Sequence, residues 1–168
     1  MDSTAPPAPA TNRLLLAAQG YAELGMIDEA FAELDALSPP ATAARQERRA
    51  EVLHLRVQLL FQTRRWESAL EVCRRLCELE PEAPQPFIHA AFCLHELGRT
   101  AEARTLLLRG PAALKREATY YYNLGCYDTA LNDLVSAENH LRASFQMDKK
   151  LRDFARTDPD LVRMRHLL

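Results

Sequence analysis

Residues 93–107 read CLHELGRTAEARTLL and carry the pattern that decides the fold, which is a helical stretch, a glycine turn and a second helical stretch. An alanine, Ala103, stands early in the second stretch. Ala69 and Ala137 stand in the same place in their own segments, 34 residues before and after it. An interval of this length is typical of a repeated pair of helices that stacks on its neighbours. The spacing therefore predicts a chain built from helix pairs.

The same frame predicts how the helices pack and turn. An earlier unit fits it around Ala30, with about five residues (39 − 34) inserted where Pro39 and Pro40 break the helix. Small residues at the frame positions of the alanines let two helix backbones approach closely. Glycine adopts a positive φ easily, so Gly25 and Gly98 mark the turns within two pairs, and an asparagine does so in the last pair. Arginine at the equivalent place of the second unit, residue 64, predicts a different turn.

Four segments carry a resemblance to a known family: YAELGMIDEAFAEL, RRWESALEVCRRLCELEP, CLHELGRTAEARTLL and YNLGCYDTALNDLVSAENHL. Together they resemble the tetratricopeptide repeat family over roughly residues 12–150. The chain departs from the family pattern at Arg56, Val57 and Asp128. The resemblance implies an all-α fold, a right-handed α-solenoid of about four helix pairs.

The last part of the chain, residues 151–168, resembles the ending of some bacterial members of this family. A solenoid needs a cap with a polar outer side, because its last pair exposes an apolar face. We expect a capping helix that begins near Leu151, followed by a short helix that Thr157 caps. The side chains expected to point inward are Leu151, Phe154, Ala155, Leu161, Val162 and Met164.

Composition restricts the class of protein. Residues 1–11, MDSTAPPAPAT, are small and proline-rich, which predicts a disordered segment rather than a signal peptide. The formal net charge of −2 gives no general attraction to nucleic acid or to anionic membranes. No apolar run approaches the roughly 20 residues that cross a bilayer. We therefore expect a cytoplasmic protein that binds neither nucleic acid nor membrane.

No residue pattern indicates catalysis, so the sequence predicts neither an enzyme nor a cofactor. The glycines of residues 20–25 have the spacing of a phosphate-binding loop, but Met26 and Ile27 follow them instead of lysine and serine or threonine. Cysteines at 73 and 77, like His89 and Cys93, stand four residues apart, which leaves a zinc site as an alternative. Their places in the repeat favour buried, reduced thiols instead.

The resemblance also implies a site. In this family the first helix of each pair lines a concave groove that binds partners. The groove positions of this chain are Leu15, Gln19, His54, Gln58, Phe61, Ile88, Phe92, His95, Tyr122 and Cys126. Three of them are aromatic (Phe61, Phe92 and Tyr122), and they either anchor a partner or pack between repeats. Leu15, His54 and Ile88 stand where family members that bind chaperone C-termini have a polar clamp, so that mode is not expected.

We therefore expect a non-enzymatic adaptor that binds a partner peptide or helix through apolar anchors. One alternative comes from the stretch PFIHAAFCLHELGRTAEARTLL, which begins at Pro86 and is similar to the middle repeat of class II chaperones of type III secretion. Those proteins hold apolar segments of translocators. Because a terminal helix face could pair with itself, a homodimer is also a candidate assembly.

Overall fold

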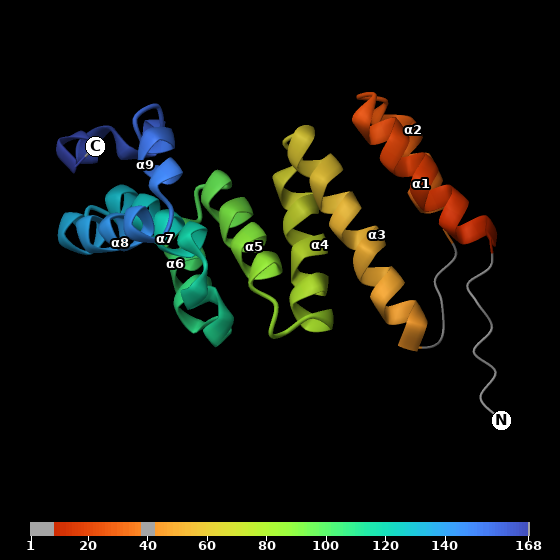
Figure 1. The fold of residues 1–168 in the computed structure, drawn as a ribbon, viewed down its shortest axis with the longest axis horizontal. Coiled ribbons are helices and arrows are strands. Elements are labelled where there is room, and N and C mark those ends of the chain that lie inside the picture. Colours follow the sequence, from red (N-terminus) through yellow and green to blue (C-terminus); the bar gives the residue numbers. More distant parts are fainter. Residues whose placement is uncertain (1–8, 38–42, 168) are drawn as a thin grey trace. The chain divides into compact units, whose positions relative to one another are not determined.

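All regular structure in the described part of the chain is helical (Figure 1). The computed structural model describes residues 9–37 and 43–167. The chain divides after Arg65 into two compact units. The predicted all-α fold is confirmed.

The N-terminal unit contains three helices, α1 (Pro9–Glu23), α2 (Ile27–Asp35) and α3 (Ala43–Gln62). Helices α1 and α2 form the predicted pair, and α3 packs against them. The core of this unit consists of Ala18, Ala30, Leu34, Leu55 and Leu59. Helix α1 begins three residues before the predicted start at Asn12. The rest of the segment predicted to be disordered, and the two prolines predicted to break a helix, lie outside the described residues.

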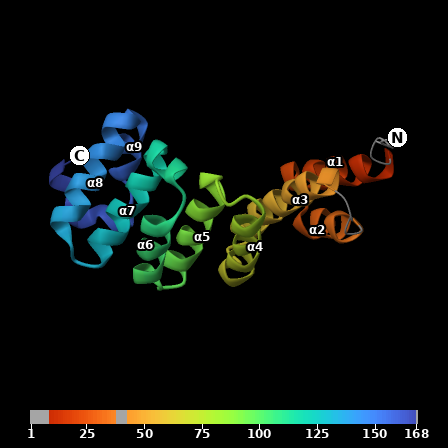
Figure 2. The same cartoon turned by 90° about the horizontal axis from the view of Figure 1, so that it is seen from below.

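The C-terminal unit continues the pattern of paired helices (Figures 1 and 2). Helix α4 (Trp66–Leu79) packs on α5, and the pairs α5–α6 and α7–α8 follow. The later elements are α5 (Pro84–Glu96), α6 (Thr100–Arg109), the 3-10 helix η1 (Ala112–Arg116), α7 (Ala118–Ala130) and α8 (Leu134–Met147). The three alanines that define the 34-residue interval are fully buried, as the frame predicts.

Four turns between helices have the same backbone geometry. One residue in each has a positive φ, which is 73° at Gly25, 54° at Arg64, 75° at Gly98 and 66° at Asn132. The next N–H donates to a carbonyl five residues back in every case, as from Arg65 to Leu60 at 2.9 Å. The prediction of a different turn at Arg64 is therefore wrong. Hydrogen bonds of this Schellman type outweigh the modest cost of a side chain at a positive φ.

The close approach of helices α7 and α8 depends on one glycine. A Cβ atom on Gly125 would lie 2.6 Å from Cγ of Leu141, a fully buried side chain. The absence of a side chain at Gly125 therefore lets the two helices approach closely.

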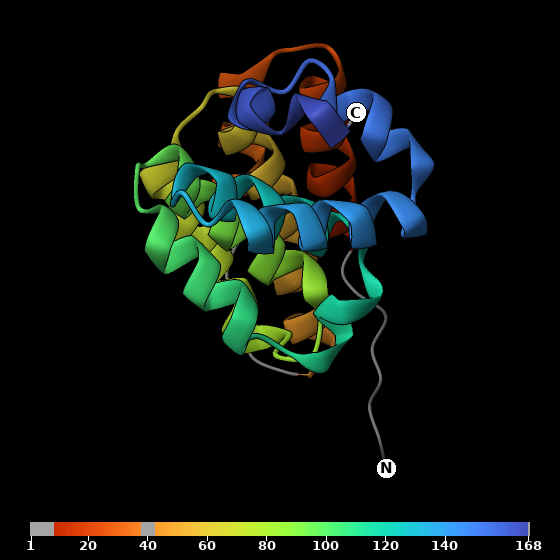
Figure 3. The same ribbon diagram turned by 90° about the vertical axis from the view of Figure 1, so that its left-hand side faces the viewer.

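The C-terminal segment folds back along the last helix pair (Figure 3). Helix α9 (Lys149–Ala155) packs on α8, and the 3-10 helix η2 (Pro159–Leu167) packs on α7 and α8. Asp158 caps η2 by accepting the N–H of Asp160 at 2.9 Å. The predicted cap at Thr157 is wrong, because that hydroxyl instead donates to the carbonyl of Phe154 at 3.1 Å.

The inward face predicted for this segment is confirmed only in part. Ala155, Leu161 and Met164 are buried. Phe154 is 61% exposed and Val162 is 54% exposed, so both are wrongly predicted as inward. Helix η2 turns Leu161 and Met164 toward the helix pairs, which leaves Val162 on its outer side, whereas Phe154 lies on the surface of α9.

Candidate functional site

The predicted groove residues of the N-terminal unit differ in exposure. Leu15 packs against the core of the unit, whereas Gln19 and Gln58 are exposed. His54 and Phe61 on α3 are half-buried. The two glutamines are therefore the groove positions of this unit that solvent reaches most freely.

On α5, the first predicted aromatic position of the C-terminal unit is engaged in packing. The ring of Phe92 lies 5.5 Å from the ring of Trp66, edge to face. Ile88, one turn earlier, is buried. Phe92 thus has the contact expected of a ring that packs between repeats, and Ile88 has little surface to offer a partner.

Three further groove residues converge on the C-terminal segment of the chain itself. The hydroxyl of Tyr122 donates to Oδ2 of Asp158 at 2.6 Å, and Sγ of Cys126 lies 3.9 Å from the same oxygen. Nε2 of His95 lies 3.0 Å from Oδ2 of Asp160. The groove positions of α5 and α7 thus hold an acidic turn, residues 158–160, which the sequence interpretation assigned to a cap rather than to the groove.

These contacts change the proton affinity of the groups involved. The hydrogen bond from His95 lowers the pKa of Asp160 below its usual range, which favours the carboxylate. Burial raises the pKa of Tyr122, and the hydrogen bond to Asp158 raises it further. Burial also raises the pKa of Cys126, with the nearby carboxylates adding to the effect. The hydroxyl and the thiol are therefore held as neutral hydrogen-bond donors facing two carboxylates.

Apolar contacts complete the site around this turn. Leu161 and Met164 of η2 are fully buried. The ring of His95 lies 4.9 Å from that of Tyr127, tilted by 40°, and the ring of Tyr122 lies 5.8 Å from that of Phe154. Burial of two large apolar side chains beside two hydrogen-bonded carboxylates is an arrangement suited to holding a short peptide segment.

The comparisons with known proteins agree with the helix pairs described above. Residues 60–124 match the family model described as tetratricopeptide repeat. Over this segment the chain resembles tetratricopeptide repeats. No curated protein sequence compared with the chain matches it. Repeats of this kind build extended surfaces for protein–protein interaction.

Solved structures with a similar fold include three named MamA. One is "MamA 41-end from Desulfovibrio magneticus RS-1", with 19% identity and a TM-score of 0.69, covering 84% of this chain and 77% of that chain. The "MamA RS-1 ArsTM double mutant" has 13% identity and a TM-score of 0.69, with 84% and 76% covered. "MamA MSR-1 C2" has 16% identity and a TM-score of 0.64, with 89% and 82% covered. These likenesses concern the fold, and they agree with the predicted α-solenoid; the chaperone resemblance is not confirmed by them.

Asp128, a departure from the tetratricopeptide pattern, forms a buried ionic network. Nε of Arg104 lies 2.5 Å from its Oδ1, and Nδ1 of His140 lies 2.7 Å from its Oδ2. The carboxylate has no exposed surface, whereas Arg104 and His140 are about a third and a quarter exposed. The network joins helices α6, α7 and α8. Its partners lie 24 and 12 residues away, so the sequence carried no local signal for it.

The cysteines of the repeats are placed mainly as packing residues. Cys73, Cys93 and Cys126 are buried, and Cys77 is half-buried. Cys73 shares a hydrogen bond with Cys93, which is the main reason that its pKa is raised. Burial raises the pKa of Cys77 to about 11. Across residues 9–37 and 43–167, no group of three or more His, Cys, Asp or Glu could hold a metal ion.

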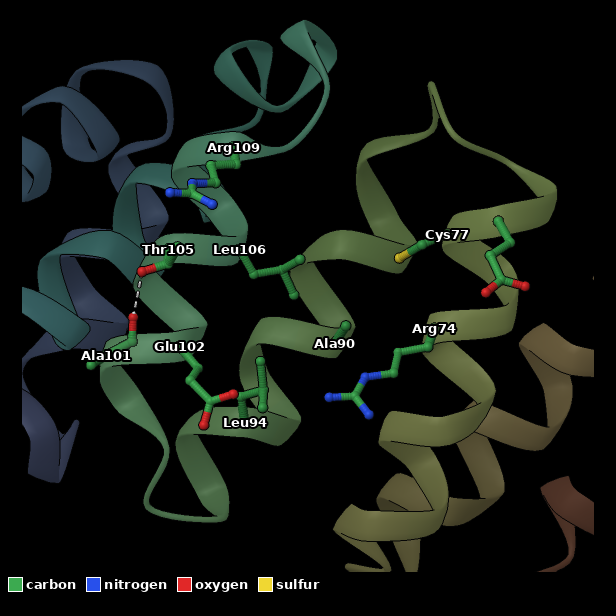
Figure 4. A pocket seen from close by; sticks show the side chains of 10 residues that line it. Arg74, Cys77, Ala90, Leu94, Ala101, Glu102, Thr105, Leu106 and Arg109 are labelled. Atoms are coloured by element: carbon green, nitrogen blue, oxygen red, sulfur yellow. Dashed lines mark hydrogen bonds between the residues drawn. The ribbon is translucent and has the colours of Figure 1, made fainter.

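A separate cavity of about 660 Å³ lies between α4, α5 and α6, away from the predicted groove residues (Figure 4). Its apolar lining includes Ala90, Leu94 and Leu106, and charged side chains border it. These charged residues are Arg74, Glu78, Glu102 and Arg109. The mixture of both signs of charge favours no single class of ligand.

A second hollow, of about 620 Å³, lies among α8, α9 and η2 and is rich in basic side chains. Arg142 is paired with Glu138 at 2.6 Å, and Arg152 donates to the carbonyl of Leu167 at 3.2 Å. Arg142 and Arg152 are therefore already engaged in contacts within the fold.

In the part of the chain that the structure describes, no helix is both long enough and apolar enough to cross a membrane.

Proposed function

We propose that the protein is a non-enzymatic scaffold that binds a segment of a partner protein along the groove positions of its tetratricopeptide repeats. The observation that carries this proposal is that His95, Tyr122 and Cys126 hold a peptide segment of the chain itself. Side chains at these groove positions therefore have the geometry to bind a segment through its carboxylate side chains.

The proposed partner segment is extended or helical and inserts apolar anchors. Phe61 of the N-terminal unit and Phe92 of the C-terminal unit are both half-buried, so each is a candidate contact for an apolar anchor within its own unit. Gln19 and Gln58 are exposed and can provide hydrogen bonds to a partner backbone, because an amide side chain both donates and accepts. Large rings beside adaptable polar groups are a common composition for protein interfaces.

Site-specific photo-crosslinking tests the proposal in the full chain. A photoreactive residue replaces Gln58 on the groove side of α3, and the matched control places it at Arg49, nine residues earlier. At about 100° per residue, nine residues place the control on the opposite face of the helix. We expect a partner, identified by mass spectrometry, to be captured at position 58 and not at position 49, and then to bind the purified protein in solution.

Equal capture at both positions, or failure of the captured protein to bind the folded chain, would contradict the groove assignment. A second copy of the chain captured at position 58 would instead indicate self-association.

The four unpaired thiols fit a reducing compartment. We therefore infer a cytoplasmic location, which cell fractionation tests.

A further inference from the structure

We propose that residues 157–167 are an internal ligand of the groove, and that the partner carries the same chemistry and binds by replacing them. These residues are called the internal ligand below. The partner segment would then contain two carboxylates two residues apart, followed by two apolar anchors. This inference rests on the proposed function and specifies the chemistry of the partner.

The groove supplies a separate donor to each carboxylate of the internal ligand. Tyr122 on α7 donates to Asp158 at 2.6 Å, with the thiol of Cys126 3.9 Å from the same oxygen. His95 on α5 faces Asp160 at 3.0 Å. The donors come from two helices, so their spacing is set by the packing of the repeats. A segment with only one carboxylate would leave one of these groups without its acceptor.

The orientation of His95 is fixed by a second contact. Its Nδ1 lies 2.9 Å from the hydroxyl of Thr100, at the start of α6. When that hydroxyl donates to Nδ1, the ring proton is on Nε2 and points to Asp160. The imidazole can therefore serve as a donor to a carboxylate while it is neutral.

The apolar contacts define the rest of the recognised segment. Leu161 and Met164 are three residues apart in η2, and both are fully buried against the helix pairs. Val162 points outward and is 54% exposed. The pattern that the groove accepts is thus Asp-x-Asp, an apolar residue directly after it, and a second apolar residue three positions later.

Two features favour replacement of the internal ligand. Residues 159–167 form a nine-residue 3-10 helix, a conformation with poorer hydrogen bonds that is uncommon beyond three or four residues. The hydroxyl of Tyr127 is buried and has no hydrogen-bond partner among the described residues. The ring of Tyr127 lies 4.9 Å from that of His95, the residue that contacts Asp160. A partner that offers the Tyr127 hydroxyl an acceptor would gain a contact that the internal ligand does not make.

Covalent attachment gives the internal ligand an effective concentration in the millimolar range. A free segment of the same sequence should therefore bind weakly to the unaltered chain. A substitution that weakens binding of the attached segment should leave the groove free for the added one. The measurable quantity is the difference in affinity for the free segment between such a variant and the unaltered chain.

The probe is a fluorescent synthetic peptide of residues 156–167, RTDPDLVRMRHL, titrated into the full chain by anisotropy. We expect the variants Leu161→Ser and Asp160→Ala to bind it at least tenfold more tightly than the unaltered chain. Adding Tyr122→Phe to the first variant should reduce that affinity at least tenfold. A peptide with both aspartates changed to asparagine should bind at least tenfold more weakly.

The inference is overturned if both variants keep their helicity and bind the probe no better than the unaltered chain. Equal binding of the asparagine peptide would also overturn it. A dimer of the unaltered chain in light scattering, without enhanced probe binding by either variant, would assign the groove to exchange between two copies. If a crosslinked partner binds but does not compete with the probe, the internal-ligand inference is wrong and the proposed scaffold function still holds. If the variants bind the probe but no partner is captured, the groove recognises this chemistry and the proposed scaffold function is contradicted.

Discussion

Nε of Arg104 lies 2.5 Å from Oδ1 of Asp128, a carboxylate with no exposed surface. A buried charge is tolerated only when it is paired, so removal of one partner costs more than the pair itself contributes. We expect Arg104→Met to lower the free energy of unfolding by about 3 kcal/mol. The matched control is Arg142→Met, which breaks an exposed pair with Glu138 and should cost under about 1 kcal/mol. Urea unfolding measures the loss of stability in both variants. An equal loss would argue that burial of Asp128 does not raise the cost of removing its partner.

Gly125→Ala should destabilise the protein by about 1–3 kcal/mol, because the added methyl group overpacks the contact with Leu141. The control is Gly20→Ala in α1, where a Cβ meets no atom within 4 Å. That change should stabilise the protein by about 0.5–1 kcal/mol, since alanine is the better helix former. Thermal unfolding of the two variants should shift in opposite directions, and a neutral Gly125→Ala would refute the close approach.

Arg64→Gly should stabilise the protein by about 0.5–1 kcal/mol. The residue has a φ of 54°, a conformation that costs energy for any residue with a Cβ and little for glycine. Gly98→Ala makes the reverse change at the equivalent turn, where φ is 75°, and should destabilise by about 1 kcal/mol. Chemical denaturation distinguishes the two, and a loss of stability in Arg64→Gly would point to a role for the arginine side chain.

The attachment of η2 should weaken in acid. The pKa of Asp160 is lowered in the folded state by the hydrogen bond from His95. Its stabilising contribution is therefore fully present above the ordinary aspartate pKa of about 4 and is lost as the pH falls through the lower folded value. After correction for the intrinsic slowing of amide exchange by acid, the exchange of residues 159–167 should be faster at acidic pH in the unaltered chain, because protection is lost.

The same experiment has two comparison variants. Asp160→Asn should show the faster exchange already at neutral pH, with a weaker dependence on acid. Asp153→Asn, which changes an 82% exposed side chain on α9, should behave like the unaltered chain. Identical pH profiles for all three proteins would remove Asp160 as the titrating group.

Cys77 should be the thiol that reacts first in the folded protein, and it should react slowly. It is half-buried with a pKa of about 11, so about one molecule in a thousand carries the thiolate at pH 8. Cys73, Cys93 and Cys126 are buried and should react only on unfolding. Titration with an aromatic disulfide reagent, with and without denaturant, checks this, and Cys77→Ser should abolish the first phase. Rapid reaction of more than one thiol in the native state would contradict the burial described here.

The departures from the repeat show where sequence interpretation reached its limit. The turn at Arg64 was predicted to differ because residue preference was weighed without the hydrogen bonds that all four turns share. Asp128 was recognised as unusual, but its partners come from two other helices. The three aromatic groove positions, Phe61, Phe92 and Tyr122, lie on α3, α5 and α7, yet nothing in the repeat frame indicated that Tyr122 would be covered.

The sequence by itself determined the helix pairs, the buried alanines, and the turns at Gly25 and Gly98, because these follow from side-chain size and φ preference within one repeat. The tertiary structure alone decided what lies in the groove of the C-terminal unit. Tyr122 meets Asp158 across 36 residues of sequence, and His95 meets Asp160 across 65. Contacts over such separations depend on the direction in which the last segment folds back. That direction is set by the burial of Leu161 and Met164 against finished helix pairs, a surface that exists only after the repeats have packed.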